Sequence, residues 1–220
     1  MKKTIYSAFI FAALGLTACN SGEEASAKDE TQAENKEEEK VETVEYNLVA
    51  SESHVDWRGA WIAPGEDGEM QEMKHHTGNV QISEGNVTVE GEDVSGSFAI
   101  DMTTITNEDL ADDEEQKAKI EGHLSSEDFF NVSEYAKTDV TLKSVENGEA
   151  NIVINVLGME MEETVPVTTK MEGDKMMMTG DFTIDFADLG FKMFSPNPEK
   201  PEEGNINSKI DFTLHAVMEK

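Results

Sequence analysis

Residues 94–102, Val94-Ser95-Gly96-Ser97-Phe98-Ala99-Ile100-Asp101-Met102, alternate between apolar and polar side chains with a period of two. Successive side chains of a β-strand point to opposite faces, so one face of this segment carries Phe98, Ile100 and Met102. The polar residues Ser95, Ser97 and Asp101 lie on the other face, which can contact solvent. The segment therefore predicts a strand with one buried face.

Four further segments show the same alternation, with apolar residues at Val140 and Leu142, at Ile152, Ile154 and Val156, at Phe182, Ile184 and Phe186, and at Ile210, Phe212, Leu214, Ala216 and Met218. Turn sequences separate the apolar runs: Glu84-Gly85-Asn86, Glu90-Gly91-Glu92, Glu146-Asn147-Gly148 and Glu172-Gly173-Asp174. Such turns connect antiparallel strands. Residues 46–220 are thus predicted to form one mainly β domain, an antiparallel sheet closed into a barrel.

Residues 107–131 interrupt this pattern with helix-forming residues. Within this predicted helical insertion we expect Leu110, Ala118, Ile120 and Leu124 to face inward, and a second helix to begin within Ser125–Asp128. The insertion ends in Phe129-Phe130. We expect it to cover the barrel or one of its mouths.

The first residues have the form of a secretory signal. Lys2 and Lys3 precede an apolar run that is too short to span a bilayer comfortably, and Leu16-Thr17-Ala18-Cys19 resembles a lipobox. Residues 1–18 are therefore predicted to be removed, and Cys19 to carry fatty acyl chains such as palmitate that anchor the protein to a membrane. Asn20 is not the aspartate that retains lipoproteins in the inner membrane. This favours the outer membrane, on its periplasmic side or at the cell surface.

Residues 19–45 are rich in charged and small residues and nearly free of apolar ones, which predicts a flexible acidic tether. The chain holds 47 acidic against 17 basic residues and has a formal net charge of −30. This charge argues against a nucleic-acid partner. The negative charge could solvate the protein surface or could recognise a partner, and the sequence leaves both roles open. Because Cys19 is the only cysteine, the domain can form no internal disulfide.

The sequence carries no catalytic motif such as Gly-x-Ser-x-Gly or a phosphate-binding loop, so we expect a protein that is not an enzyme and that needs no cofactor. His75 and His76, with Glu69 and Glu72 nearby, raise a divalent-metal site as an alternative. Neighbouring residues of a strand point to opposite faces, so the two histidines could not share one ion. We prefer the interpretation that these histidines are hydrogen-bonded or form a polar pocket rim, and that they bind no metal.

Methionine and tryptophan residues leave alternatives open. Met176 and Met178 share one face of a strand, as do Met159 and Met161, and could fill the core, line a lipid pocket or bind copper. Trp57 and Trp61 face the same side if the strand is extended. They could plug one end of the barrel or flank the mouth of a cavity.

Several stretches resemble the YceI-like family: Gly96–Ile105, His123-Leu124-Ser125-Ser126-Glu127-Asp128-Phe129-Phe130-Asn131-Val132 with Tyr135, Trp57-Arg58-Gly59, His76-Thr77-Gly78 and Gly180–Asp185. The resemblance spans about residues 46–218. It implies an eight-stranded, lipocalin-like antiparallel barrel whose apolar interior holds an isoprenoid chain, such as that of a polyprenyl phosphate or a quinone.

The resemblance and the alternation together predict an envelope lipoprotein that binds, carries or sequesters an isoprenoid or another amphiphilic lipid without catalysis. His76 and His123 are candidates for a polar rim. Candidate lining residues are Trp57, Trp61, Phe98, Ile100, Met102, Leu124, Phe129, Phe130, Ile152, Ile154, Met176, Met178, Phe182, Ile184 and Phe186. Two alternatives stay open, namely a structural or interaction lipoprotein with a self-filled barrel and an enzyme that modifies a bound lipid.

The lipobox generates a first test. We expect Cys19→Ala to accumulate as an unprocessed precursor without acyl mass, because alanine cannot form the thioether. Mass spectrometry of the N-terminal peptide measures both properties. A wild-type peptide that lacks diacylglycerol would refute the anchor.

Overall fold

The structure of the protein is a computed structural model, and it describes residues 41–191 and 194–220. The predicted signal segment 1–18, the predicted lipidation site Cys19 and the predicted tether as far as residue 40 lie outside the described residues. Strand β1 begins at Thr43, within the last residues of the segment 19–45. In the part of the chain that the structure describes, no helix is long and apolar enough to cross a membrane.

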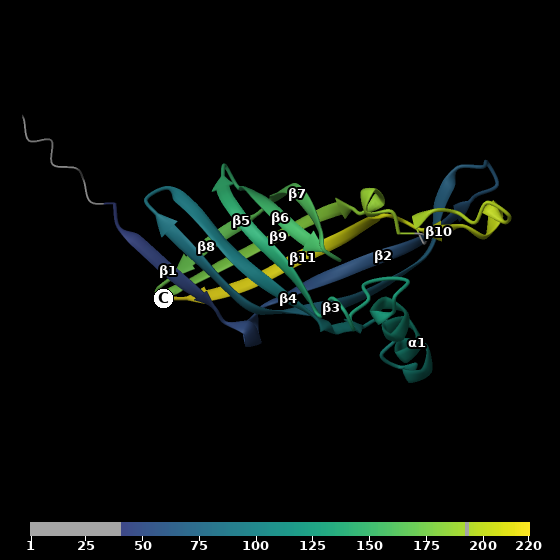
Figure 1. Ribbon diagram of the computed structural model, residues 1–220, viewed down its shortest axis with the longest axis horizontal. Helices are drawn as coiled ribbons and strands as arrows, with labels where there is room; N and C mark the ends of the chain where they lie inside the picture. Colours follow the sequence, from purple (N-terminus) through teal and green to yellow (C-terminus); the bar gives the residue numbers. More distant parts are fainter. Residues whose placement is uncertain (1–40, 192–193) are drawn as a thin grey trace, which may run out of the picture. The chain divides into compact units, whose positions relative to one another are not determined.

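The domain is mainly β, as the alternation predicted, and its sheet contains 11 strands (Figure 1). In chain order these are β1 (Thr43–Leu48), β2 (His54–Pro64), β3 (Met70–Glu90), β4 (Asp93–Asn107), β5 (Lys137–Glu146), β6 (Glu149–Val156), β7 (Met159–Pro166), β8 (Thr168–Glu172), β9 (Lys175–Asp185), β10 (Asn205–Ile206) and β11 (Lys209–Glu219). One α-helix, α1 (Glu114–Ser125), and the short 3-10 helices η1 (Ala50–Glu52), η2 (Ala187–Leu189) and η4 (Pro201–Glu203) complete the described elements.

Antiparallel pairing closes the sheet on itself. β3 pairs with β4, β4 with β5, β5 with β6, and β6 with β7. On the other side β8 pairs with β9, β9 with β11, and β11 with both β1 and β2, and these two strands also pair with β3. Only Val167 separates β7 from β8, and the short helix η1 separates β1 from β2. When each interrupted pair is counted as one strand and the two-residue β10 is left out, the circuit has the eight positions of a lipocalin-like barrel.

Two residues allow the interrupted strands, β1 with β2 and β7 with β8, to fit into the barrel. Ser53, between η1 and β2, accepts a hydrogen bond at its hydroxyl from the Val217 N–H at 2.9 Å and donates to the Val49 carbonyl at 2.9 Å. This ties the kinked first strand to β11. Gly180 of β9 faces the end of β7, where a Cβ would lie 2.3 Å from the Pro166 carbonyl oxygen. Glycine is therefore required for β9 to approach the break between β7 and β8.

Three of the four predicted turns are confirmed, since Gly91, Asn147, Gly148 and Gly173 adopt positive φ angles between strands. The prediction of a turn at Glu84-Gly85-Asn86 is wrong, because β3 runs through these residues without a break. Gly85 lies opposite Phe98, and a Cβ there would come within 2.4 Å of the Phe98 ring. This glycine makes room for an aromatic ring within the sheet.

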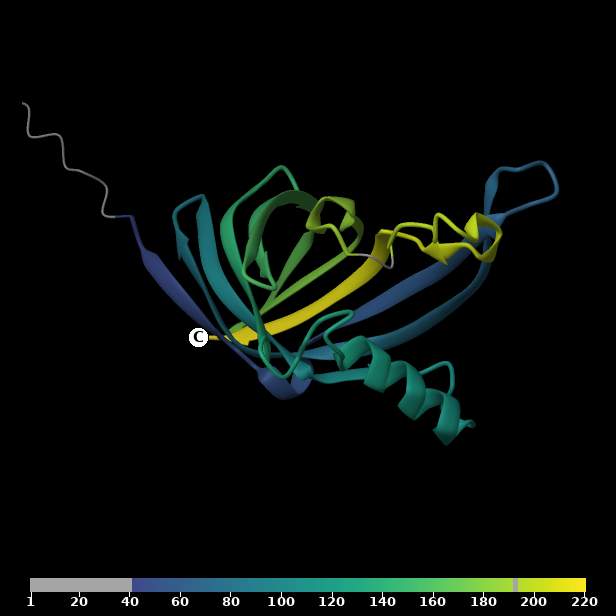
Figure 2. The ribbon, with the colours of Figure 1, turned by 45° about the vertical axis from the view of Figure 1, so that its right-hand side comes forward.

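The predicted helical insertion is confirmed in place but is shorter than residues 107–131. Asp113 caps α1 by accepting a hydrogen bond from the Gln116 N–H at 3.1 Å, and the helix ends at Ser125. No second helix begins within Ser125–Asp128, since turns follow there. Ala118 is exposed rather than inward. Figure 2 shows α1 beside the end of β4, whereas β10 lies beside β2.

Side chains fill the barrel at the end where β1 meets β11. Met218 and Val87 are completely buried there, and Tyr46 and Met176 are buried in the same cluster. These residues come from β11, β3, β1 and β9, so the packing joins strands from both sides of the closure. This end is a packed core.

The packed end generates a second test. We expect Met218→Ala to lower the free energy of unfolding by about 2–5 kcal/mol, because it leaves a cavity among buried neighbours. Met171→Ala, at a β8 position that is 48% exposed, should change it by less than about 0.5 kcal/mol. Denaturant unfolding of both variants measures the difference. Equal losses would contradict the packed end.

Candidate functional site

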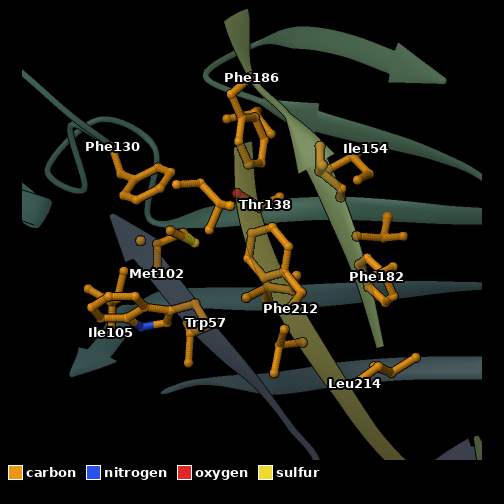
Figure 3. Close-up of a pocket in the computed structure, with 18 of the residues that line it drawn as sticks. Trp57, Met102, Ile105, Phe130, Thr138, Ile154, Phe182, Phe186, Phe212 and Leu214 are labelled. Atoms are coloured by element: carbon orange, nitrogen blue, oxygen red, sulfur yellow. The ribbon is translucent and has the colours of Figure 1, made fainter. Parts of the chain in front are cut away.

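A cavity of about 360 Å³ occupies the barrel interior beyond the packed end. This volume lies within the range of small-molecule binding sites. Side chains of β2, β3, β4, β5, β6, β7, β9 and β11 line it, together with α1 and residues of the segments that follow α1 and β9. Figure 3 shows Phe182, Phe186, Phe212 and Leu214 around this space, with Trp57, Met102, Ile105 and Phe130 beside it.

All but one of the lining candidates from the sequence lie on the cavity wall: Trp57, Trp61, Phe98, Ile100, Met102, Leu124, Phe129, Phe130, Ile152, Ile154, Met178, Phe182, Ile184 and Phe186. Met176 is the exception, although it shares a face with Met178. Met176 lies opposite Met218 across the β9–β11 pair, and the two large side chains fill the barrel. Met178 lies opposite Ala216, whose small side chain leaves the space open.

The sequence missed several wall residues, and two groups of them show why. Val55, Val80 and Ile82 continue the inward faces of β2 and β3, and extending the period-two rule from Trp57 on β2 and from His76 on β3 would have found them. Phe191, Phe194 and Ile206 also line the cavity. Phe191 and Phe194 come from the irregular stretch after β9, and Ile206 comes from the two-residue strand β10, which is too short for a periodic pattern to mark an inward residue.

The mouth of the cavity lies beside Trp61, His123, Phe191 and Ile206, because these residues also line an adjoining surface recess. Aromatic rings gather here. Phe129 contacts His123 edge-on at 5.3 Å between centroids and Phe194 at 6.5 Å, and Phe194 lies 5.4 Å from Phe191. The contacts join the turn after α1 to the segment after β9, so the two segments cover the cavity together.

Glu121 attaches α1 to the barrel. Its carboxylate accepts hydrogen bonds from the Asn107 N–H at 2.9 Å and from the Thr106 hydroxyl at 2.8 Å, at the end of β4. Burial acts to raise the pKa of Glu121, but these two hydrogen bonds and the nearby charge of Lys117 outweigh it and hold the pKa below its usual value. The attachment places Ile120, His123 and Leu124 of α1 on the cavity wall.

A second polar cluster orients His76, the other predicted rim residue. Asp109 accepts hydrogen bonds from the Thr77 N–H at 2.7 Å and from the Asn107 side-chain amide at 2.8 Å, and it pairs with His76 Nδ1 at 2.9 Å. Burial acts to raise the pKa of Asp109, and the three partners lower it by more. His76 is thereby fixed at the cavity wall.

The divalent site considered for His75 and His76 does not assemble. His75 Nδ1 lies 2.9 Å from Glu72, which also forms an ion pair with Arg58 at 2.6 Å, whereas His76 pairs with Asp109. The two histidines thus have different carboxylate partners. Glu69 instead lies in the turn that connects β2 to β3.

Trp57 brings one unpaired polar group to the cavity wall. Its side chain is buried, and its indole N–H is the one buried side-chain polar atom that has no hydrogen-bond partner among the residues that the structure describes. Leaving such a donor unpaired costs about 1–3 kcal/mol. The indole of Trp61, by contrast, donates to the Glu203 carbonyl at 3.1 Å.

Solved structures share this fold at low sequence identity. A polyisoprenoid binding domain from Saccharophagus degradans, implicated in plant cell wall breakdown, has a TM-score of 0.52 and 11% identity, with 79% of this chain and 97% of that chain covered. Burkholderia cenocepacia BcnA has a TM-score of 0.53 and 14% identity, with 77% of this chain and 98% of that chain covered. No curated protein sequence matches the chain.

The model of the YceI-like domain matches residues 46–218, a range that takes in nearly the whole described barrel, the cavity and α1. The motifs that carried the resemblance now have places in the structure. Trp57 and His76 lie on the cavity wall, and His123, Phe129 and Phe130 lie on its cover. The chain belongs to the YceI-like domain family.

Proposed function

We propose that the protein binds an amphiphilic lipid, with an isoprenoid chain as the favoured ligand, inside the barrel and carries or sequesters it without chemical change. One observation supports this most strongly. The cavity wall is apolar, and among the residues that the structure describes its only polar side chains are Lys74, His76, His123 and Thr138, besides the indole groups of Trp57 and Trp61. Burial of apolar surface, at about 0.8 kcal/mol per methylene, would supply the affinity.

The arrangement of polar groups supports an amphiphile rather than a hydrocarbon. Trp61 and His123 lie at the mouth, and Lys74 pairs in register with Trp61 across β2 and β3. A head group held there would keep its polar atoms near water while its chain entered the barrel. An oxygen atom of the ligand beside Trp57 would also pair the free indole N–H.

The polyisoprenoid named for the Saccharophagus degradans domain motivates the choice of chain class. The proposal of a binding protein rests on the wall itself. Thr138 is the only hydroxyl-bearing residue on it, and no pair of carboxylates faces the cavity within the described residues. Catalysis by a carboxylate pair, or by a hydroxyl nucleophile other than Thr138, would need such groups in reach of the bound chain.

We further propose that the domain works in the cell envelope, held to a membrane by acylated Cys19. Two or three acyl chains on this cysteine would give the stable anchoring that one chain does not. A tethered binder stays next to the bilayer that contains its ligand. The lipobox at Leu16–Cys19 and the acidic segment 19–45 support this localisation.

The cavity itself generates a third test. We expect Ile154→Trp, on the wall in β6, to keep the melting temperature of the delipidated protein while the amount of co-purified lipid falls severalfold, because the larger ring occupies ligand space (Figure 3). In a packed core the same change would cost about 1–3 kcal/mol through overpacking.

Val153→Trp is the matched control, since Val153 directly precedes Ile154 in β6 and points away from the cavity. It should leave bound lipid unchanged. Lipid is measured by native mass spectrometry and by extraction from protein prepared without detergent. A wild type without lipid, together with a destabilised Ile154→Trp variant, would refute the proposal.

The attachment of α1 generates a fourth test. Because the pKa of folded Glu121 lies below its ordinary value of 4.5, the attachment stabilises the cover above that pH and is lost as the pH falls through the lowered pKa. We expect lipid release to accelerate at acidic pH in the wild type. Glu121→Gln should already release lipid faster at pH 7.

The rate of lipid release from Glu121→Gln should also depend less on pH than the wild-type rate. Part of the pH dependence will remain, because the pKa of Asp109 is lowered as well. Glu115→Gln removes the same charge from an exposed position of α1 and should behave like the wild type. Stopped-flow transfer of lipid to vesicles measures the rates. Equal rates for Glu121→Gln and Glu115→Gln at pH 7 would show that the attachment does not control the cover.

A further inference from the structure

Two histidines and one aspartate meet on the outer surface of the barrel, on the opposite face of strands that line the cavity. His54 of β2 lies directly opposite His215 of β11, and Asp56 follows His54 on the same face of β2. Val55 and Trp57, and likewise Leu214 and Ala216, point to the cavity instead. The cluster is therefore separate from the proposed lipid site.

The metal-binding atoms of these side chains converge. His54 Nε2 lies 3.6 Å from Asp56 Oδ1, and His215 Nε2 lies 3.5 Å from Asp56 Oδ2. The two imidazole rings are 4.8 Å apart between centroids and inclined by 30°. One ligand atom from each residue lies within 4.8 Å of the others.

These separations are longer than hydrogen bonds, which join nitrogen and oxygen at 2.7–3.2 Å. The other two paired histidines differ in this respect, since His75 and His76 each approach a carboxylate to 2.9 Å. Zinc holds nitrogen and oxygen ligands at about 2.0–2.2 Å, which places two ligand atoms about 3.4 Å apart in a tetrahedral site. The spacing in the cluster matches a shared ion better than direct pairing.

Nearby charges favour a cation. Arg58, the next outward residue of β2, is paired with Glu72 at 2.6 Å and with Asp211 at 3.7 Å, so these carboxylates neutralise the adjacent positive charge. Thr213 lies opposite Asp56 and donates a hydrogen bond to Asp181 at 2.7 Å, which keeps a further carboxylate on this face. The chain as a whole has a net charge of −30, which raises the concentration of cations at its surface.

We propose that His54, Asp56 and His215 bind one divalent transition-metal ion, with zinc or copper as the favoured class. Two imidazoles and one carboxylate suit these ions rather than magnesium or calcium, which prefer oxygen ligands. The half-exposed position leaves a fourth coordination place for water. The ion would connect β2 to β11 and so clamp the seam at which the barrel closes.

The sequence alone does not reveal this site, because His54 and His215 belong to the first and last strands of the barrel circuit. Only the β2–β11 register makes them neighbours. Asp56 lies two residues from His54, a spacing that shares a strand face and is otherwise common among the 47 acidic residues.

The test uses the chain from position 19 onward without an affinity tag and with Cys19→Ser, since tag histidines and the thiol would themselves bind zinc. Isothermal titration with zinc chloride should show one ion per chain. The melting temperature should rise with zinc, because the ion binds the folded seam and not the unfolded chain. Calcium chloride should have neither effect.

His54→Gln, Asp56→Asn and His215→Gln should each weaken zinc binding by about tenfold or more, because loss of an outer-shell partner alone costs 10–100-fold. His75→Gln, a change at an exposed histidine paired with Glu72, is the matched control and should bind zinc like the parent protein. Melting without metal verifies the fold of each variant. Cobalt would report tetrahedral coordination by its visible absorption, and only in chains with all three ligands.

An unchanged zinc affinity in His215→Gln and Asp56→Asn variants that melt normally would overturn the proposal, as would the absence of any binding to the parent protein. An equal loss in His75→Gln would assign the binding to scattered surface histidines and overturn it too. Since these readouts need no lipid, the outcome is independent of the proposed lipid binding.

Discussion

The pairing of the last strand with the first determines the rest of the structure. β11 pairs with β2 from Asp211 to His215 and with β1 near its end, and this closes the circuit that otherwise follows neighbouring strands. In a closed barrel each strand has an interior and an exterior face, so a period of two along the sequence becomes an inside and an outside. Ser53 stabilises the closure at the kink between β1 and β2 by bonding to the backbone of Val217.

Given closure, side-chain volume decides where the interior is core and where it is cavity. The two β9–β11 pairs at Met176–Met218 and Met178–Ala216 are neighbours, yet the first fills the barrel and the second borders open space. The same reasoning explains Gly85, whose missing side chain makes room for Phe98, a residue of the wall. Alternation identifies the inward residues. The size of the residue on the partner strand then determines whether an inward residue fills the core or borders the cavity.

The sequence predicted the mainly β class, the barrel, three glycine-containing turns and the position of the helical cover. These features depend on local patterns or on the motifs around Gly96 and His123. Other features depend on register between distant strands, which one sequence does not reveal. Four findings are of this kind. Met176 fills the core instead of lining the cavity, and β3 continues through Gly85. Glu121 attaches α1 to Asn107, and His54 lies opposite His215. Phe191 and Phe194 were missed for a different reason, since they lie in an irregular segment without periodicity.

The cover differs physically from the barrel, and this difference suits a binding cycle. An empty apolar cavity of this size would cost several kcal/mol by the relation measured for core cavities, a large part of the stability of a domain. A bound chain would offset that cost, but it must first pass the cover. α1 contains no buried residue, and polar contacts of Glu121 attach it to the end of β4. An element with little buried surface opens at low cost in free energy while the hydrogen-bonded barrel stays intact. A part of the domain with little buried surface thus lies where the proposed ligand would enter.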